Sequence, residues 1–175
     1  MILKLKRTPG IYLIGFMGSG KSTVGRALAN HLGWSFIDLD AEIERREGAT
    51  ISDLFETRGE PEFRGAETAA LREQVQAVER ARARVVSLGG GAFEREENRA
   101  LVANNGVSVW LDCPLELVER RIAGFSHRPL ARDPQKLREL FATRKTGYGL
   151  ADYRVAIDSD DAAIAVERIM ALGLF

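Results

Sequence analysis

Cysteines and long apolar runs are scarce in this chain of 175 residues. No apolar stretch is long enough to span a bilayer, and residues 1–7 lack the continuous apolar core of a secretory signal. The only cysteine, Cys113, has no second cysteine for an internal disulfide, which favours a reducing compartment. We therefore expect a soluble, cytoplasmic protein with no membrane partner, in which Cys113 is a small packed residue.

An excess of charge of either sign is also missing, since 25 basic and 25 acidic residues cancel. This balance gives no electrostatic reason to expect nucleic acid as a partner. Hydrophobic residues make up 45% of the chain, enough for a sizeable core. We predict one domain over residues 1–175 and, because no amphipathic stripe is left over, a monomer.

Strand-like and helical patterns alternate along the chain, which predicts an α/β fold with a five-stranded parallel sheet and helices on both faces. Ligands then gather at the carboxyl edge of the sheet. The expected strands are residues 11–14, 35–37, 84–88, 107–111 and 153–157. The expected helices are residues 22–32, 41–47, 62–81, 95–104, 115–123, 135–143 and 161–172.

A phosphate-binding loop is the most specific motif, because residues 15–22 match G-x-x-x-x-G-K-[ST] between an expected strand and an expected helix. The motif predicts that Lys21 reaches the β- and γ-phosphates of a nucleotide and that Ser22 binds Mg²⁺. A glycine turn without a ligand is the alternative, which the strand and helix context disfavours. The predicted phosphate-binding residues are Gly18, Ser19, Gly20, Lys21, Ser22 and Thr23.

Two acidic residues, Asp38 and Asp40, follow the second expected strand and alternate around Leu39. Beside a phosphate loop, one carboxylate can hold water of the Mg²⁺ shell while the other orients or deprotonates an attacking hydroxyl. The alternative for Asp40 is that it caps the helix expected from Ala41.

Two further clusters fall near the same edge. The run Gly89, Gly90 and Gly91 follows the third strand, where it permits close approach of a ligand and positive φ angles, or forms only a flexible turn. Arg64 and Glu67 are spaced to pair on one helical face, either as part of a site or as a surface pair.

Residues 124–134 break the helical pattern and contain Arg128, which makes them a candidate mobile lid. Arg144 ends the next expected helix. Phosphoryl transfer benefits from a mobile guanidinium group that stabilises the developing charge, and binding of an anionic substrate benefits from a bidentate guanidinium group. The alternative is that either arginine is merely solvated.

The chain resembles the shikimate kinase family over residues 11–166. The resemblance depends on several motifs in the same order: Gly15–Arg26, the pair Asp38 and Asp40, Phe63–Glu67, Gly89–Gly91, Val109–Asp112 and Arg128–Leu130. It implies a three-layer αβα fold of the P-loop NTPase type, similar to nucleoside monophosphate kinases. It also implies transfer of the γ-phosphate of ATP to the 3-hydroxyl of shikimate.

The resemblance also implies a role for each matching residue near the phosphates. Lys21 would contact the β- and γ-phosphates, Ser22 would bind Mg²⁺, and Asp38 would support that ion through water. Asp40 would hydrogen-bond the 3-hydroxyl as orienter or base.

Further roles concern the substrate and the adenine. Arg64 and Arg144 would hold the shikimate carboxylate. The glycines 89–91 would line the substrate site, with their amides near the ring hydroxyls or the reacting phosphate. Arg128 would stabilise the transferred charge, and Arg121 would lie near adenine.

The chain departs from the family pattern after Arg144, where the family has a proline and this chain continues Lys145-Thr146-Gly147-Tyr148. We expect a looser turn there. Three alternatives share the phosphate loop: gluconate-type kinases, nucleoside monophosphate kinases and a regulatory module that binds nucleotide without transfer. The combination of Phe63–Glu67 with the glycine run argues against a gluconate-type kinase. A clamp sized for one carboxylate argues against a nucleoside monophosphate kinase. The presence of Asp40 argues against a module without transfer, which needs no base.

Overall fold

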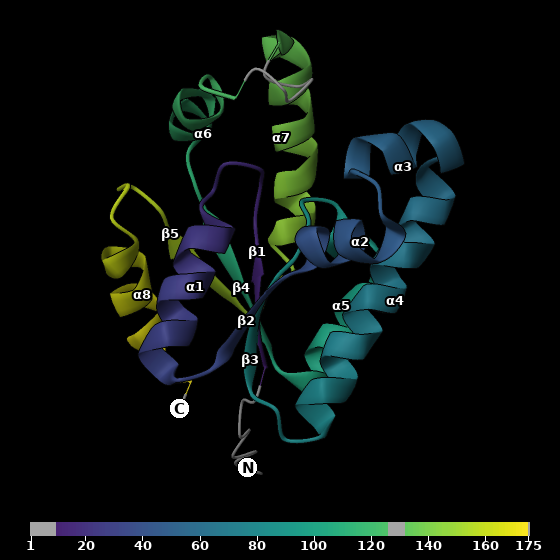
Figure 1. Cartoon of the computed structure of the whole chain (residues 1–175). Helices are drawn as coiled ribbons and strands as arrows, with labels where there is room; N and C mark the ends of the chain where they lie inside the picture. The colour runs from purple at the N-terminus through teal and green to yellow at the C-terminus, as the bar shows by residue number, and fades with distance from the viewer. Residues whose placement is uncertain (1–9, 126–131, 175) are drawn as a thin grey trace.

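The computed structural model describes residues 10–125 and 132–174, and it has three layers with a parallel sheet in the middle (Figure 1). The predicted fold class is confirmed. The strands are β1 (Gly10–Ile14), β2 (Ser35–Asp38), β3 (Arg84–Ser87), β4 (Val107–Asp112) and β5 (Tyr153–Ala156), in the order β2-β3-β1-β4-β5.

Strand β1 lies at the centre of the sheet because it pairs with β3 on one side and β4 on the other. All five of its residues are buried. A strand covered by helices on both faces has no solvent side, which explains why its sequence is continuously apolar rather than alternating.

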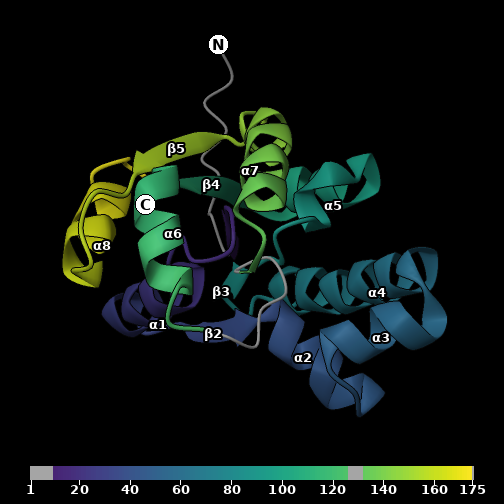
Figure 2. The same ribbon diagram turned by 90° about the horizontal axis from the view of Figure 1, so that it is seen from above.

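Helices cover both faces of the sheet (Figures 1 and 2). Helices α1 and α8 pack together on one face, and α4 and α5 pack together on the other. The helices are α1 (Lys21–Leu32), α2 (Leu39–Glu47), α3 (Ile51–Arg58), α4 (Glu60–Glu79), α5 (Glu96–Asn105), α6 (Leu115–Ile122), α7 (Pro134–Tyr148) and α8 (Ala162–Met170), with a 3₁₀ helix η1 (Ala92–Glu94).

Helix α3 is absent from the sequence prediction, although its signals are present. Thr50 caps it and forms a reciprocal capping box with Asp53, and Ile51, Leu54 and Phe55 follow helical spacing. Its eight residues are short enough to be mistaken for a loop.

Two predicted boundaries are wrong in ways that matter for the site. Helix α2 begins at Leu39, because the Asp38 carboxylate caps it by accepting from the backbone N–H of Ala41 at 3.3 Å. The alternative role of Asp40 as the helix cap is therefore wrong. Helix α7 extends to Tyr148, five residues beyond the predicted end at Thr143.

No helix in residues 10–125 and 132–174 is both long and apolar enough to cross a membrane.

Helix α1 approaches the sheet closely at Gly25, where an added Cβ would overlap the ring of Phe36 on β2. We expect Gly25→Ala to lower the free energy of unfolding by about 1–3 kcal/mol, because the partly buried ring must move away from the core face it packs on. Equilibrium urea unfolding measures the change.

Gly65, in the exposed face of α4, is the matched control because an added Cβ there meets no atom within 4 Å. Gly65→Ala should raise the free energy of unfolding by about 1 kcal/mol, through the better helix propensity of alanine. Equal effects of the two variants would contradict the close packing of Gly25.

Candidate active site

The phosphate loop between β1 and α1 has backbone angles that require glycine. Gly18 and Gly20 lie in the left-handed region, with φ of 74° and 94°, and the N–H of Ser19 donates to the Phe16 carbonyl at 3.1 Å. Helix α1 begins directly afterwards at Lys21, so its N-terminus adjoins the loop.

Two polar groups in this loop are arranged for an anion. The Lys21 ammonium donates to the carbonyls of Gly15 and Phe16 at 2.8 and 3.0 Å, which holds it against the loop. The Ser19 hydroxyl is buried and, in the described part of the chain, has no hydrogen-bond partner. A buried hydroxyl with unused capacity fits a ligand that brings its own polar atoms.

Ser22 and Asp38 form a direct contact between α1 and β2, since the Ser22 hydroxyl donates to the Asp38 carboxylate at 2.6 Å. Hydroxyl and carboxylate oxygens suit Mg²⁺, which keeps most of its water and substrate ligands and needs few from the protein. The described residues contain no cluster of three His, Cys, Asp or Glu side chains that could hold a metal ion.

Asp40 lies in the first turn of α2 and is half-buried. Burial raises the pKa of its carboxyl group, and the negative charges of Asp38 and Glu44 raise it further, while Lys21 and Arg64 oppose the shift. Asp38 ends a strand and Asp40 belongs to a helix, so the expected alternation along an extended backbone is wrong.

The glycine run after β3 makes room for charged side chains. A Cβ on Gly89 would lie 2.5 Å from Asp40 Oδ1 and 3.2 Å from Glu67 Oε2, and one on Gly91 would overlap the Arg64 guanidinium. None of the three glycines has a positive φ, so the conformational freedom that the run permits is not used. The run serves close approach of these side chains.

Arg64 and Glu67 pair within α4 at 2.9 Å between Nη1 and Oε1. The Glu67 side chain is 1% exposed, so this is not the surface pair considered above. Burial raises the pKa of Glu67, and the positive charges of Arg64 and Arg144 oppose that shift. Arg144 of α7 therefore belongs to the same charged cluster as Asp40.

Tyr148 joins α7 to the glycine run, because its hydroxyl donates to the Gly90 carbonyl at 2.6 Å. Burial raises the pKa of this hydroxyl. The looser turn expected after Arg144 is wrong: the helix continues through Gly147, and an added Cβ at Gly147 would overlap the Glu94 carboxylate.

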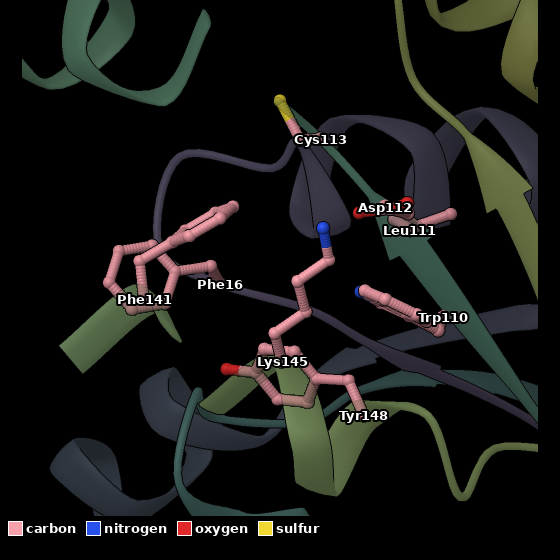
Figure 3. A pocket seen from close by; sticks show the side chains of 8 residues that line it. All are labelled: Phe16, Trp110, Leu111, Asp112, Cys113, Phe141, Lys145 and Tyr148. Atoms are coloured by element: carbon pink, nitrogen blue, oxygen red, sulfur yellow. The ribbon is translucent and has the colours of Figure 1, made fainter. Parts of the chain in front are cut away.

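A small pocket of about 10 Å³ lies between the phosphate loop and α7 (Figure 3). Phe16 of the loop meets Phe141 edge to face at 5.2 Å, and Trp110 lies 6.1 Å from Tyr148 between ring centres. Figure 3 shows Lys145 extending between these two aromatic pairs toward the end of β4.

Cys113 borders the same pocket (Figure 3). It is buried, and burial raises the pKa of its thiol, which keeps the sulfur protonated. Its predicted role as a packed residue is confirmed.

A wider pocket of about 310 Å³ opens on the other side of the phosphate loop, beside Thr23. Arg121 of α6 borders it and donates to the carbonyls of Gly18 and Ser159 at 2.9 and 3.0 Å, and to the Asp160 carboxylate at 3.0 Å. Arg121 thereby ties the phosphate loop to the segment after β5.

Arg128 and residues 126–131 of the predicted lid lie outside the described residues. One residue of the charged cluster, Glu94, is missing from the sequence prediction. The ion pair of Arg144 Nη1 with Glu94 Oε1, at 3.9 Å, brings it there. Gly147 is the one sequence signal for this contact, because a glycine within a helix leaves room for a neighbouring side chain. It does not identify Glu94 as that neighbour.

Comparisons with known proteins point in one direction. The family model for shikimate kinases matches residues 17–172. A shikimate kinase from a Sulfurihydrogenibium species is 44% identical over 161 residues, which cover 91% of this chain and 95% of that protein.

Solved structures agree with the sequence relatives. The shikimate kinase from Acinetobacter baumannii in complex with shikimate has a TM-score of 0.87 and 40% identity, covering 96% of this chain and 94% of that one. The shikimate kinase from Aquifex aeolicus has a TM-score of 0.81 and 36% identity, covering 93% of this chain and 94% of that one.

We expect Tyr148→Phe to lower the free energy of unfolding by about 1–2 kcal/mol, because it leaves the Gly90 carbonyl without its donor. Chemical denaturation measures the loss. Tyr153→Phe, at a half-buried tyrosine of β5, is the control. A loss no larger than that of the control would show that the bond to Gly90 contributes little.

Proposed function

Because the chain belongs to the shikimate kinase family, we propose that its charged edge transfers the γ-phosphate of ATP to the 3-hydroxyl of shikimate, giving shikimate 3-phosphate and ADP. The protein is an ATP-dependent kinase that acts on shikimate. One observation carries the residue assignments: Asp40, Arg64 and the glycine run meet at the edge of the sheet that also holds the phosphate loop.

We assign the triphosphate to the phosphate loop. Residues 18–23 would surround the β- and γ-phosphates, with the Lys21 ammonium exchanging its loop carbonyls for phosphate oxygens. Ser22 and Asp38 would hold Mg²⁺, the first directly and the second through water. The ion, when bound, neutralises phosphate charge.

Asp40 is assigned to the acceptor hydroxyl. Its carboxylate lies against the bare backbone of Gly89, where a substrate can approach the main chain. The environment that raises its pKa also makes the carboxylate a better proton acceptor than an exposed aspartate. Asp40 would orient the hydroxyl and accept its proton as the phosphoryl group transfers.

The substrate's carboxylate is assigned to Arg64 and Arg144. Both side chains are mostly covered, at 15% and 19% exposed, and both act on the buried Glu67. Two guanidinium groups converging from α4 and α7 offer several N–H donors for one carboxylate. Tyr148 fixes α7 against the glycine run and so fixes the position of Arg144 relative to Arg64.

The adenosine is assigned to the wider pocket that Arg121 borders. Its volume of about 310 Å³ lies at the lower end of the usual range for ligand pockets. The role of Arg128 in stabilising the transferred phosphoryl group stays a prediction.

We also infer a cytoplasmic monomer. Within residues 10–125 and 132–174, the large apolar side chains that are exposed are Phe125 and Leu150. They belong to different segments of the chain, so they give no reason to expect a subunit interface. The cytoplasmic location is inferred from the single buried cysteine, which favours a reducing compartment.

The reaction is tested by measuring ADP release from MgATP with shikimate, with gluconate, with nucleoside monophosphates and without acceptor. We expect turnover that depends on shikimate. Measurable ATP binding without turnover on any acceptor would instead support a regulatory nucleotide-binding module.

Asp40→Asn tests the proposed base. We expect kcat to fall by at least about 100-fold while ATP binding is kept, since proton acceptance is lost. Folding raises the pKa of Asp40, so the native state is destabilised as the pH rises from the pKa of the unfolded state through the higher pKa of the folded state. The variant should therefore be at least as stable as the wild type at neutral pH.

Two measurements decide the outcome for Asp40: steady-state kinetics and thermal unfolding at neutral pH. Near-normal kcat would remove Asp40 from the mechanism. A large loss of stability would mean instead that the low activity reflects misfolding.

A further inference from the structure

Each arginine assigned to the substrate carboxylate already faces a carboxylate of the chain itself. Arg64 donates to Glu67 at 2.9 Å, and Glu67 is 1% exposed. Arg144 lies 3.9 Å from Glu94, whose side chain is 34% exposed. The first pair is a buried hydrogen-bonded unit, whereas the second is longer than a hydrogen bond and open to solvent.

The backbone of Glu94 is fixed at the end of the glycine run. Its N–H donates to the Gly91 carbonyl at 3.2 Å within η1. The Arg99 guanidinium donates to the carbonyls of Phe93 and Glu94 at 2.8 and 2.7 Å. The same loop that makes room for Arg64 therefore sets the position of Glu94.

Helix α7 provides the space for the Glu94 carboxylate. Gly147 lies three residues after Arg144, so the two share a helical face. An added Cβ at Gly147 would overlap the carboxylate, with Glu94 Cδ only 3.1 Å away. Glycine is unfavourable in the interior of a helix. The packing of the Glu94 side chain against Gly147 is a physical reason for a glycine at this position of α7.

We propose that Glu94 is a positioning residue that sets the affinity of this kinase for its anionic acceptor. Its negative charge partly neutralises Arg144 before substrate arrives, and it opposes the incoming carboxylate through the same guanidinium. Glu94 acts on binding alone, because the reacting hydroxyl is assigned to Asp40 on a different element. This inference rests on the proposed role of Arg144.

The test is Glu94→Gln, which removes the charge and keeps the shape. We expect KM for shikimate to fall about two- to fivefold, in the range of a partly exposed ion pair, with kcat and KM for ATP unchanged. Inhibition by the methyl ester of shikimate should not change, because the ester carries no charge for Glu94 to oppose. Glu96→Gln, an exposed glutamate two residues away, controls for the change in net charge.

Gly147→Ala is the second variant, since its new Cβ must displace the carboxylate. We expect it to change KM for shikimate in the wild-type background and to have little effect in the Glu94→Gln background, as coupled neighbours require. A purely structural effect of the alanine would be the same in both backgrounds.

The proposal is wrong if Glu94→Gln leaves KM for shikimate unchanged or raises it, or if inhibition by the methyl ester shifts by the same factor. It is also wrong if Gly147→Ala has equal effects in both backgrounds. Wild-type turnover with shikimate is measured first, so its absence would overturn the proposed function and not this inference.

Discussion

Two carboxylates, the half-buried Asp40 and the buried Glu67, lie close together at Gly89, and the rest of the site depends on offsetting their lost hydration. Burial raises both pKa values, and the charge of Asp40 raises that of Glu67 further, while the charges of Lys21, Arg64 and Arg144 oppose these shifts. Such a cluster is favourable only where every charge has a partner. Positive groups from α1, α4 and α7 therefore have to meet at one point.

The parallel sheet makes that meeting possible. Strands β1, β2 and β3 end at the same edge, so the loops after them deliver the phosphate loop, the acidic pair and the glycine run side by side. Strand β1 is fully buried and β3 nearly so, which provides a rigid base for polar loops. Stability is concentrated in the sheet, and charged chemistry is confined to its edge.

Local signals explain which parts could be predicted from the sequence. Residues 15–22 specify their own turn, because glycines at fixed positions permit one backbone path, and the apolar run before them has no solvent face. The start of α2 and the length of α7 could not be predicted, because they depend on the cap at Asp38 and on the bond from Tyr148 to Gly90. The pair of Arg144 with Glu94 joins residues fifty positions apart, and no local pattern announces it.

The two arginine–glutamate pairs show how one type of contact serves different purposes at different depths. Glu67 of α4 is buried, and removing its partner would leave a buried charge, so the Arg64 pair is a fixed part of the fold. Glu94 is hydrated, so its interaction with Arg144 is weaker and screened by salt. The weak pair of Arg144 can yield to a substrate carboxylate at little cost, whereas Arg64 uses only its Nη1 for Glu67 and can keep that bond. The exposed pair is therefore the place where affinity can be adjusted without disturbing the fold.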